Sequence, residues 1–207
     1  MLLRKKIYIG ETNKGVVYYN TRTGEILSSE KSKLINTEKA GNYNKYIPLI
    51  ISLLILFGSL GITAISFGIY NKTILGILVL LWILEFLGML ILVEQALYKH
   101  VKIGEITTKK EFLIAANGNL IWNNFGDKKI TIGKKIYIWI ITSIIGASGF
   151  LPILIINIVV HSFGSPIKSE IVMYSLMGIM PAVMVIGIFQ NNPIRFIKAV
   201  ENVRKNK

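Results

Sequence analysis

The sequence predicts an all-α polytopic membrane protein, with four transmembrane helices arranged as two antiparallel hairpins and a small cytoplasmic β-hairpin before each pair. Three observations indicate this fold class. Four apolar stretches of 20 to 25 residues are each long enough to cross a hydrocarbon core of about 30 Å. Hydrophobic residues make up 52% of the 207 residues, which is typical of membrane proteins. The basic residues lie almost entirely outside the apolar stretches.

The apolar stretches come in two pairs. Residues 47–70 and 74–98 are separated by only three residues, so the two helices have to lie antiparallel. Residues 136–160 and 171–190 form the second pair, and we expect Pro152 to kink the first helix of that pair. The chain therefore divides into an N-terminal segment, a first hairpin, a middle loop, a second hairpin and a basic tail: residues 1–46, 47–98, 99–135, 136–190 and 191–207.

Two segments outside the helices have the pattern of β-strands. Residues 6–27 alternate β-branched and aromatic residues with Asn and Gly turns, which predicts a hairpin or a three-stranded meander. Residues 111–132 contain apolar runs on either side of Asn117-Gly118, a strong hairpin signal. Aligning Gly15 with Gly118 makes the two segments similar, so each half of the chain could be one copy of an internal repeat. Chance similarity between two short hairpins is the alternative.

The distribution of charge predicts the topology. The net charge is +13, and 22 of the 24 Lys and Arg residues fall in the N-terminal segment, the middle loop and the tail. By the positive-inside rule these parts, and both termini, face the cytoplasm of a cell (plasma or inner) membrane. The basic residues are scattered pairs without an aromatic platform, which argues against a nucleic-acid partner. The chain has no cysteine, which excludes disulfides and thiolate chemistry.

Small residues in the second hairpin predict close helix packing, because they let neighbouring backbones approach in lipid. Spacings of three and four residues place each of two sets on one helical face. These helix-packing residues are Thr142, Gly146 and Gly149 in the first helix, and Gly178 and Ala182 in the second.

The basic tail is predicted to be helical. Asn192 suits an N-cap, and Pro193 suits the first helical position. An apolar side and a basic side follow, which is typical of a helix lying on an anionic leaflet. The alternative is a basic flank that only fixes the topology. The candidate lipid-headgroup residues are Arg195, Lys198, Arg204 and Lys205.

Glu85 is the most unusual residue within the spans. It lies near the middle of the stretch 74–98, and none of the other spans contains a Lys or Arg with which it could pair. Intramembrane acids commonly relay protons or cations or bind a partner protein. The alternative is a neutral carboxylic acid hydrogen-bonded inside the bundle, for example to Thr63 or Ser66. Asn157 is also deep in a span, and we expect it to make an interhelical hydrogen bond.

No catalytic residue, metal site or cofactor is predicted. Signatures of metalloproteases, serine hydrolases and phosphate-binding loops are missing from the sequence. His100 and His161 fall on opposite membrane faces in the predicted topology, so they cannot share a metal in one chain.

The sequence thus favours a non-enzymatic membrane interaction protein. Its partners would be the lipid bilayer and another membrane or secreted protein, and it could also form a homo-oligomer. Small, basic, multi-span bacterial proteins of this layout include toxin or bacteriocin immunity proteins and secretion-accessory factors, an analogy of architecture alone. The alternatives are a subunit of a proton- or cation-coupled transporter or channel that uses Glu85, and a membrane-tethered cytoplasmic sensor or scaffold.

Overall fold

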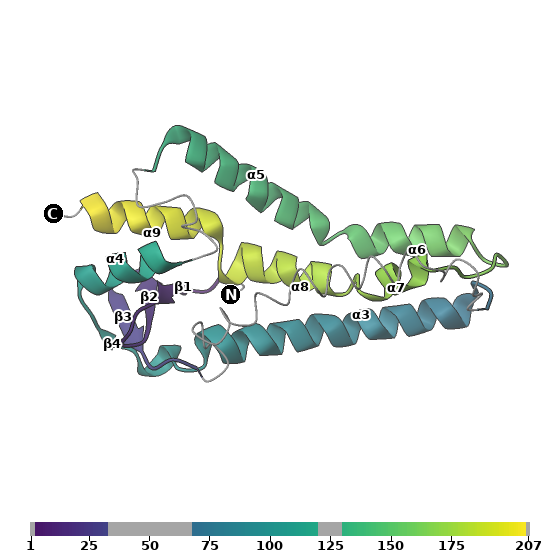
Figure 1. Cartoon of the computed structure of the whole chain (residues 1–207), viewed down its shortest axis with the longest axis horizontal. Coiled ribbons are helices and arrows are strands. Elements are labelled where there is room, and N and C mark those ends of the chain that lie inside the picture. The colour runs from purple at the N-terminus through teal and green to yellow at the C-terminus, as the bar shows by residue number, and fades with distance from the viewer. Residues whose placement is uncertain (1–2, 33–67, 120–129, 206–207) are drawn as a thin grey trace. The chain divides into compact units, whose positions relative to one another are not determined.

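The computed structural model describes residues 3–32, 68–119 and 130–205, whose contacts group the chain into two compact units (Figure 1). Unit 1 is built from Met1–Ile35, Ile91–Ala147 and Val183–Lys207, and unit 2 from Asn36–Leu90 and Ser148–Ala182. Each unit therefore combines segments that are far apart in the sequence.

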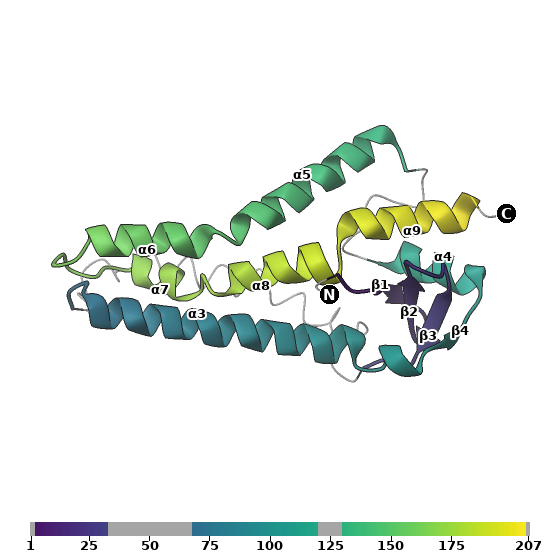
Figure 2. The ribbon, with the colours of Figure 1, turned by 180° about the vertical axis from the view of Figure 1, so that it is seen from behind.

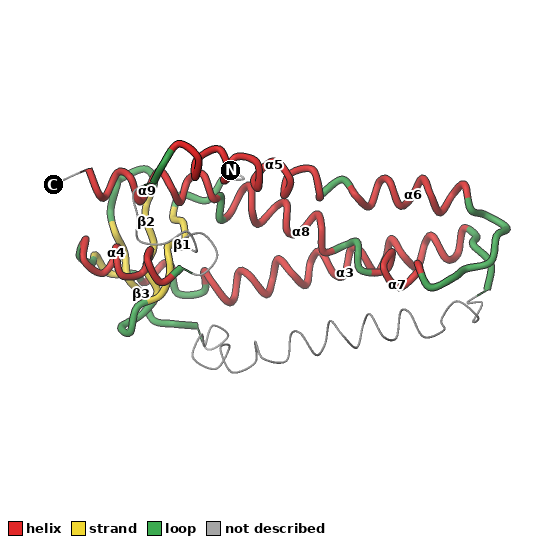
Figure 3. Tube along the Cα trace, turned by 45° about the horizontal axis from the view of Figure 1, so that its top comes forward, coloured by secondary structure: helices red, strands yellow, loops and turns green. Residues whose placement is uncertain are grey.

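Unit 1 contains a four-stranded antiparallel sheet in the order β1-β2-β3-β4, drawn in yellow in Figure 3. The strands are β1 (Lys6–Glu11), β2 (Val16–Asn20), β3 (Ile26–Ser29) and β4 (Glu105–Ile106). The first three strands confirm the predicted meander. The fourth strand comes from a segment more than 70 residues further along the chain and pairs with β3.

Both turns of the meander follow from local chemistry. Between β1 and β2, the Thr12 N–H donates to the Gly15 carbonyl at 2.8 Å, which closes a tight turn over Asn13 and Lys14. Between β2 and β3, Gly24 has φ +77°, a left-handed conformation that glycine adopts without steric cost. Two well-formed turns bring three short strands into register.

Both faces of β2 are buried. Ile7, Ile9, Val17 and Tyr19 face a core that includes residues of α4 (Lys109–Gly118) and α9 (Pro193–Lys205). The alternate β2 residues Val16 and Tyr18 face a second core, together with Tyr98 and Val101. Figure 2 shows α4 and the strands of unit 1 from behind.

The predicted hairpin at residues 111–132 is wrong in its first half, because α4 is a helix. Thr108 caps it by accepting a hydrogen bond from the Glu111 N–H at 3.3 Å. Thr-x-x-Glu is the sequence signature of a capping box. Phe112, Ala115 and Ala116 then follow at helical spacing and are buried. Asn117-Gly118 ends the helix instead of turning a hairpin, and residues 120–129 lie outside the described residues.

The described residues do not support an internal repeat. The alignment that sets Gly15 on Gly118 places β1 on residues 109–114. Those residues form α4, so the two segments differ in secondary structure.

Three stretches of the described residues are long and apolar enough to cross a membrane: Lys72–Ile103, Ile132–His161 and Glu170–Lys205. Their elements are α3 (Lys72–Val93), the π-helix η3 (Glu94–Tyr98), the 3-10 helix η4 (Val101–Ile103), α5 (Ile132–Ser148), α6 (Leu151–His161), α7 (Glu170–Ser175), α8 (Ile179–Val185), the π-helix η5 (Ile186–Gln190) and α9. These spans correspond to three of the four predicted.

The remaining predicted span, residues 47–70, lies outside the described residues except for its last three. Those three are not helical, because Gly68 has φ +101° and Ile69 forms an antiparallel bridge with Pro166. The Tyr70 N–H also donates to the Ser165 carbonyl at 3.0 Å. The boundary predicted at Tyr70 is therefore wrong.

Two prolines account for the interruptions in the last two spans. A proline has no N–H to donate, and its ring clashes with the carbonyl four residues earlier. Pro152 lies four residues after Ser148, where α5 ends. Pro181 lies four residues after Met177, in the turn that separates α7 from α8. The predicted kink at Pro152 is confirmed as a break between α5 and α6.

The tail helix α9 begins as predicted, because the Asn192 side chain accepts from the Ile194 N–H at 2.8 Å. Its apolar face does not lie on a leaflet. Phe196, Val200 and Val203 are buried in the core that they share with β1 and α4. The apolar side of this amphipathic helix, which we expected to contact a membrane surface, packs in the protein core instead.

We predict that Gly10→Ala destabilises unit 1. A Cβ at this position in β1 would lie 2.1 Å from the backbone oxygen of Ala115, and α4 would have to move away. We expect a loss of about 1–3 kcal/mol, the usual cost of overpacking. Thermal unfolding of the purified protein, followed by near-ultraviolet circular dichroism, measures this loss.

Gly133→Ala is the matched control, because the nearest described atom would lie 4.0 Å from its Cβ. Equal unfolding temperatures for the two variants would contradict the close approach of α4 to β1.

Candidate functional site

The first candidate site surrounds Glu85 in unit 2, in the middle third of α3. Opposite it the chain turns between α7 and α8 at residues 176–178. Pro181 has no N–H that could donate to the Met177 carbonyl. That carbonyl accepts from the Met180 N–H instead, at 3.2 Å. An acid within a candidate membrane span therefore lies beside an interrupted helix.

Gly178 lets the two segments approach each other closely. A Cβ at Gly178 would lie 2.3 Å from Trp82 Cα and 2.7 Å from Glu85 Oε2, so only glycine fits. Glu85 Oε2 is buried and has no hydrogen-bond partner among the described residues. The predicted hydroxyl partners, Thr63 and Ser66, lie outside the described residues. An unpaired buried polar atom costs free energy.

Trp82 fixes the packing around this acid. Its indole N–H donates to the Tyr174 carbonyl at 2.7 Å, and its ring is buried. Leu78, Ile155 and Val159 belong to the same buried cluster, which joins α3 to α6. Packing and one strong hydrogen bond therefore hold the backbone of α3 beside α7.

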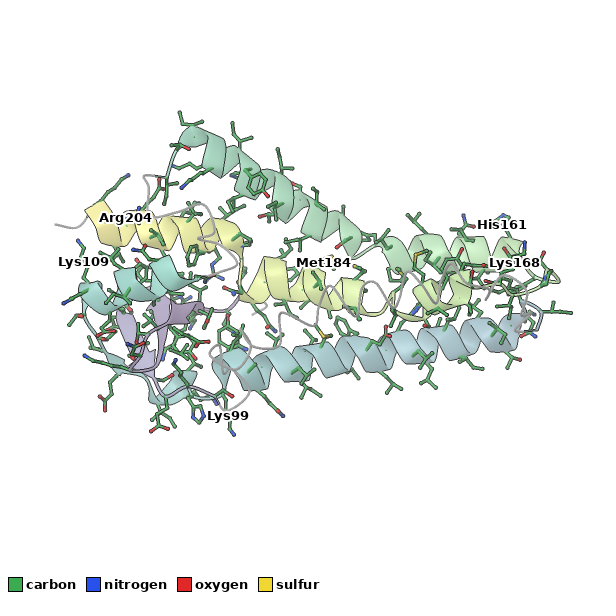
Figure 4. The ribbon with its side chains drawn as sticks, viewed as in Figure 1. Lys99, Lys109, His161, Lys168, Met184 and Arg204 are labelled. Atoms are coloured by element: carbon green, nitrogen blue, oxygen red, sulfur yellow. The ribbon has the colours of Figure 1, made fainter. Side chains whose placement is uncertain are left out.

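The loop between α6 and α7 forms a polar end of unit 2. Figure 4 labels His161 and Lys168 there. The Tyr70 hydroxyl donates to Glu170 Oε1 at 3.0 Å, and the Lys168 N–H also donates to that oxygen, at 3.3 Å. These contacts order the loop and both use Glu170 Oε1.

The other predicted packing residues lie in different environments. Thr142 is buried, and its hydroxyl donates to the Ile138 carbonyl of its own helix at 2.7 Å. Gly146 would place a Cβ 3.9 Å from Ile188, an ordinary contact. Gly149 lies in the break between α5 and α6, and Ala182 is fully buried in α8.

Asn157 is exposed in the described part of the chain, so no interhelical hydrogen bond of its side chain is seen there.

The predicted lipid-headgroup residues also lie in different environments. Arg195 turns towards the protein, and its Nη2 donates to the Arg4 carbonyl and, at 2.9 Å, to Thr21 Oγ1. Lys198 and Lys205 are exposed, and Arg204 lies in the last turn of α9 (Figure 4). Contact of these side chains with lipid stays a prediction.

Sequence reasoning missed a second candidate site, a hollow of about 590 Å³ in unit 1. It is lined by Ser28, Ser29, Glu30, His100, Ile103, Glu105, Ile106 and Thr107. Ile103 and Ile106 are 77% and 76% exposed. These residues come together only through the pairing of β3 with β4. The short stretch Glu105-Ile106-Thr107 was the one available signal, and it is too short to predict a strand.

We predict that Gly178→Ala weakens the packing of unit 2. The new methyl group would meet backbone atoms of Trp82, which cannot rotate away, so we expect a loss of about 1–3 kcal/mol. Unfolding in SDS, followed by tryptophan fluorescence, measures the change.

Gly76→Ala on α3 is the control, since no described atom lies within 4 Å of its Cβ. If the Gly178→Ala and Gly76→Ala proteins unfold at the same SDS concentration, the close contact at Gly178 is disproved.

The two sites offer different chemistry. The Glu85 site offers one buried acceptor, and the hollow offers two carboxylates, a histidine and two isoleucines. No three His, Asp or Glu side chains gather into a possible metal site in the parts of the chain that the structure describes. Comparison with known proteins finds no matching family model, no matching curated protein and no matching solved structure.

Proposed function

We propose that this chain is a non-enzymatic, multi-pass membrane protein that binds another protein. The observation that carries the proposal is the hollow in unit 1, where Ile103 and Ile106 are among the most exposed large apolar side chains described. Exposed apolar patches rimmed by polar residues commonly mark interaction sites.

The partner that fits the hollow is an extended, basic segment of another protein. Glu30 and Glu105 line the hollow, although the chain as a whole has a net charge of +13. Opposite charge at the rim favours a basic partner.

The backbone of β4 supports the same partner. The Thr107 N–H donates to the Ile26 carbonyl at 2.9 Å, so by antiparallel alternation Ile106 directs its own N–H and carbonyl away from β3. No described strand pairs with that edge, so an added strand could bind there.

A fourth membrane crossing within residues 47–70, with both termini in the cytoplasm, is part of the proposal. Ser32 donates to the Gln95 carbonyl at 3.0 Å, just beyond one end of α3, whereas Tyr70 precedes the other end. The stretch 47–70 has 24 residues without a charge, which is long enough to cross a hydrocarbon core of about 30 Å. The concentration of basic residues in the N-terminal segment, the middle loop and the tail supports a cytoplasmic location of both termini.

The narrower role, toxin or bacteriocin immunity or secretion accessory, rests on the architecture alone. A binding protein with a small cytoplasmic domain is compatible with it, and equally with a membrane-tethered sensor or scaffold. These roles differ in the partner, and the carboxylates of the hollow favour a basic one in each case.

The second candidate function is a subunit of a proton- or cation-coupled transporter or channel. The unpaired Glu85 oxygen beside an interrupted helix favours it, because transporters often place ion sites at such breaks. The close packing of Gly178 against the carboxylate favours the first proposal, since a water-filled path needs space beside the acid.

We predict that the double variant Ile103→Ser, Ile106→Ser loses its protein partner. A photo-crosslinking amino acid at Thr107, in the hollow, should give a discrete protein adduct in intact cells. That adduct should fall at least about tenfold in the double variant, as expected when two anchoring side chains are lost.

Ile114→Ser is the control, because Ile114 is an exposed isoleucine on α4 that does not line the hollow. An adduct that persists in the double variant, or that is lost equally in the control, would count against the hollow as the binding surface.

We predict that Glu85→Gln leaves partner crosslinking unchanged, since glutamine keeps the size and the acceptor oxygen. In proteoliposomes with an internal pH-sensitive dye, we expect wild type and Glu85→Gln to show the same proton leak under an imposed potential. Glu105→Gln, which removes an exposed acid, controls for surface charge. A proton flux in wild type that Glu85→Gln alone abolishes would favour the transporter instead.

A further inference from the structure

A small groove in unit 1, separate from the hollow, lies between the first half of α5 and the first three turns of α9. It has a volume of about 90 Å³. Ile194 and Ile197 of α9 give it an apolar wall, and Trp139 of α5 is 61% exposed beside it. The groove therefore combines an apolar surface with an exposed indole.

The charge in the groove is unevenly neutralised. Lys135 Nζ lies 2.7 Å from Glu201 Oε1, so this lysine and this carboxylate compensate each other. Lys198 also lines the groove, is exposed, and has no ion-pair partner among the described residues. The net charge of the lining is +1, and one ammonium group is free to bind an oxyanion.

The position of the groove along α5 matters as much as its charge. α5 begins the candidate span Ile132–His161, and Trp139 lies seven residues, or about 10 Å, along it. Tryptophan is enriched at this depth, where its ring lies beside lipid glycerol and carbonyl groups. Lys135 lies one turn, about 6 Å, before Trp139 on α5, and Lys198 of α9 lines the same groove. The groove therefore presents ammonium groups and an indole to one phospholipid headgroup and its first acyl carbons.

We propose that this groove binds the headgroup of one anionic phospholipid, with the phosphate on Lys198 and the glycerol and acyl chain along Trp139. The site differs from a basic helix lying flat on a leaflet, because the apolar face of α9 is used in the protein core. The ion pair of Glu201 with Lys135 lowers the affinity of the groove for the lipid phosphate. The proposal does not depend on the protein partner.

Native mass spectrometry of the full chain tests this site. The protein is released from detergent micelles that contain dioleoyl phosphatidylglycerol or dioleoyl phosphatidylcholine, and the retained lipid is counted. We expect one phosphatidylglycerol to be retained in preference to phosphatidylcholine. Lys198→Gln should weaken the retention about fivefold, the effect of one lysine near an anionic surface. Glu201→Gln frees Lys135 and should strengthen the retention by a similar factor.

Lys205→Gln is the matched control, because it removes the same charge from the same helix outside the groove. Equal retention of both lipids, equal losses in Lys198→Gln and Lys205→Gln, or weaker retention in Glu201→Gln would each overturn the proposal. The last experiment adds glycerol phosphate as a soluble competitor of the lipid. If it displaces the lipid at millimolar concentration, the groove recognises a soluble phosphate and the lipid assignment is wrong.

Discussion

The burial of β2 on both faces is the constraint on which unit 1 depends. Val17 and Tyr19 reach the core made with α4 and α9, while Val16 and Tyr18 reach the core beyond the end of α3. Small sheets are stable when their hydrophobic faces are packed, and both faces of β2 pack on segments from elsewhere in the chain. The N-terminal strands, the segment after α3 and the tail must therefore fold together. Burial raises the pKa of Tyr18, so its hydroxyl stays protonated and keeps donating to the Leu97 carbonyl.

Unit 2 combines a buried apolar cluster with one very close contact between α3 and the turn at Gly178. Lipid gives helices no hydrophobic reason to associate, so packing and hydrogen bonds have to hold them together. Pro181 causes the interruption between α7 and α8, and Gly178 lets that interruption approach α3. In a regular helix the Tyr174 carbonyl would accept from residue 178. Here it accepts from the Met177 N–H at 3.2 Å and from the Trp82 indole N–H at 2.7 Å. One proline, one glycine and one indole thus account for the geometry around Glu85.

Sequence alone predicts the features that depend on local composition. Apolar length located three described spans, Pro152 located a break, and Asn192 located the start of α9. Asn117-Gly118 was misleading, because the same dipeptide closes hairpins and ends helices. Thr108 and Glu111 contained the correct signal. The apolar face of α9 was misplaced because periodicity does not distinguish a leaflet from a protein core. The hollow could not be predicted from the sequence, because it forms only when β3 pairs with the distant strand β4.

The charge pattern of unit 1 narrows the partners further than the net charge does. Glu11 and Glu111 each pair with a lysine, whereas Glu30 and Glu105 line the hollow. A polyanion such as nucleic acid would be repelled by these two carboxylates at the hollow. An anionic lipid needs only the small groove beside Lys198, and a basic peptide needs only the hollow. Because one unit offers an acidic concavity and a basic one, two different ligands explain its surface better than one polyanion does.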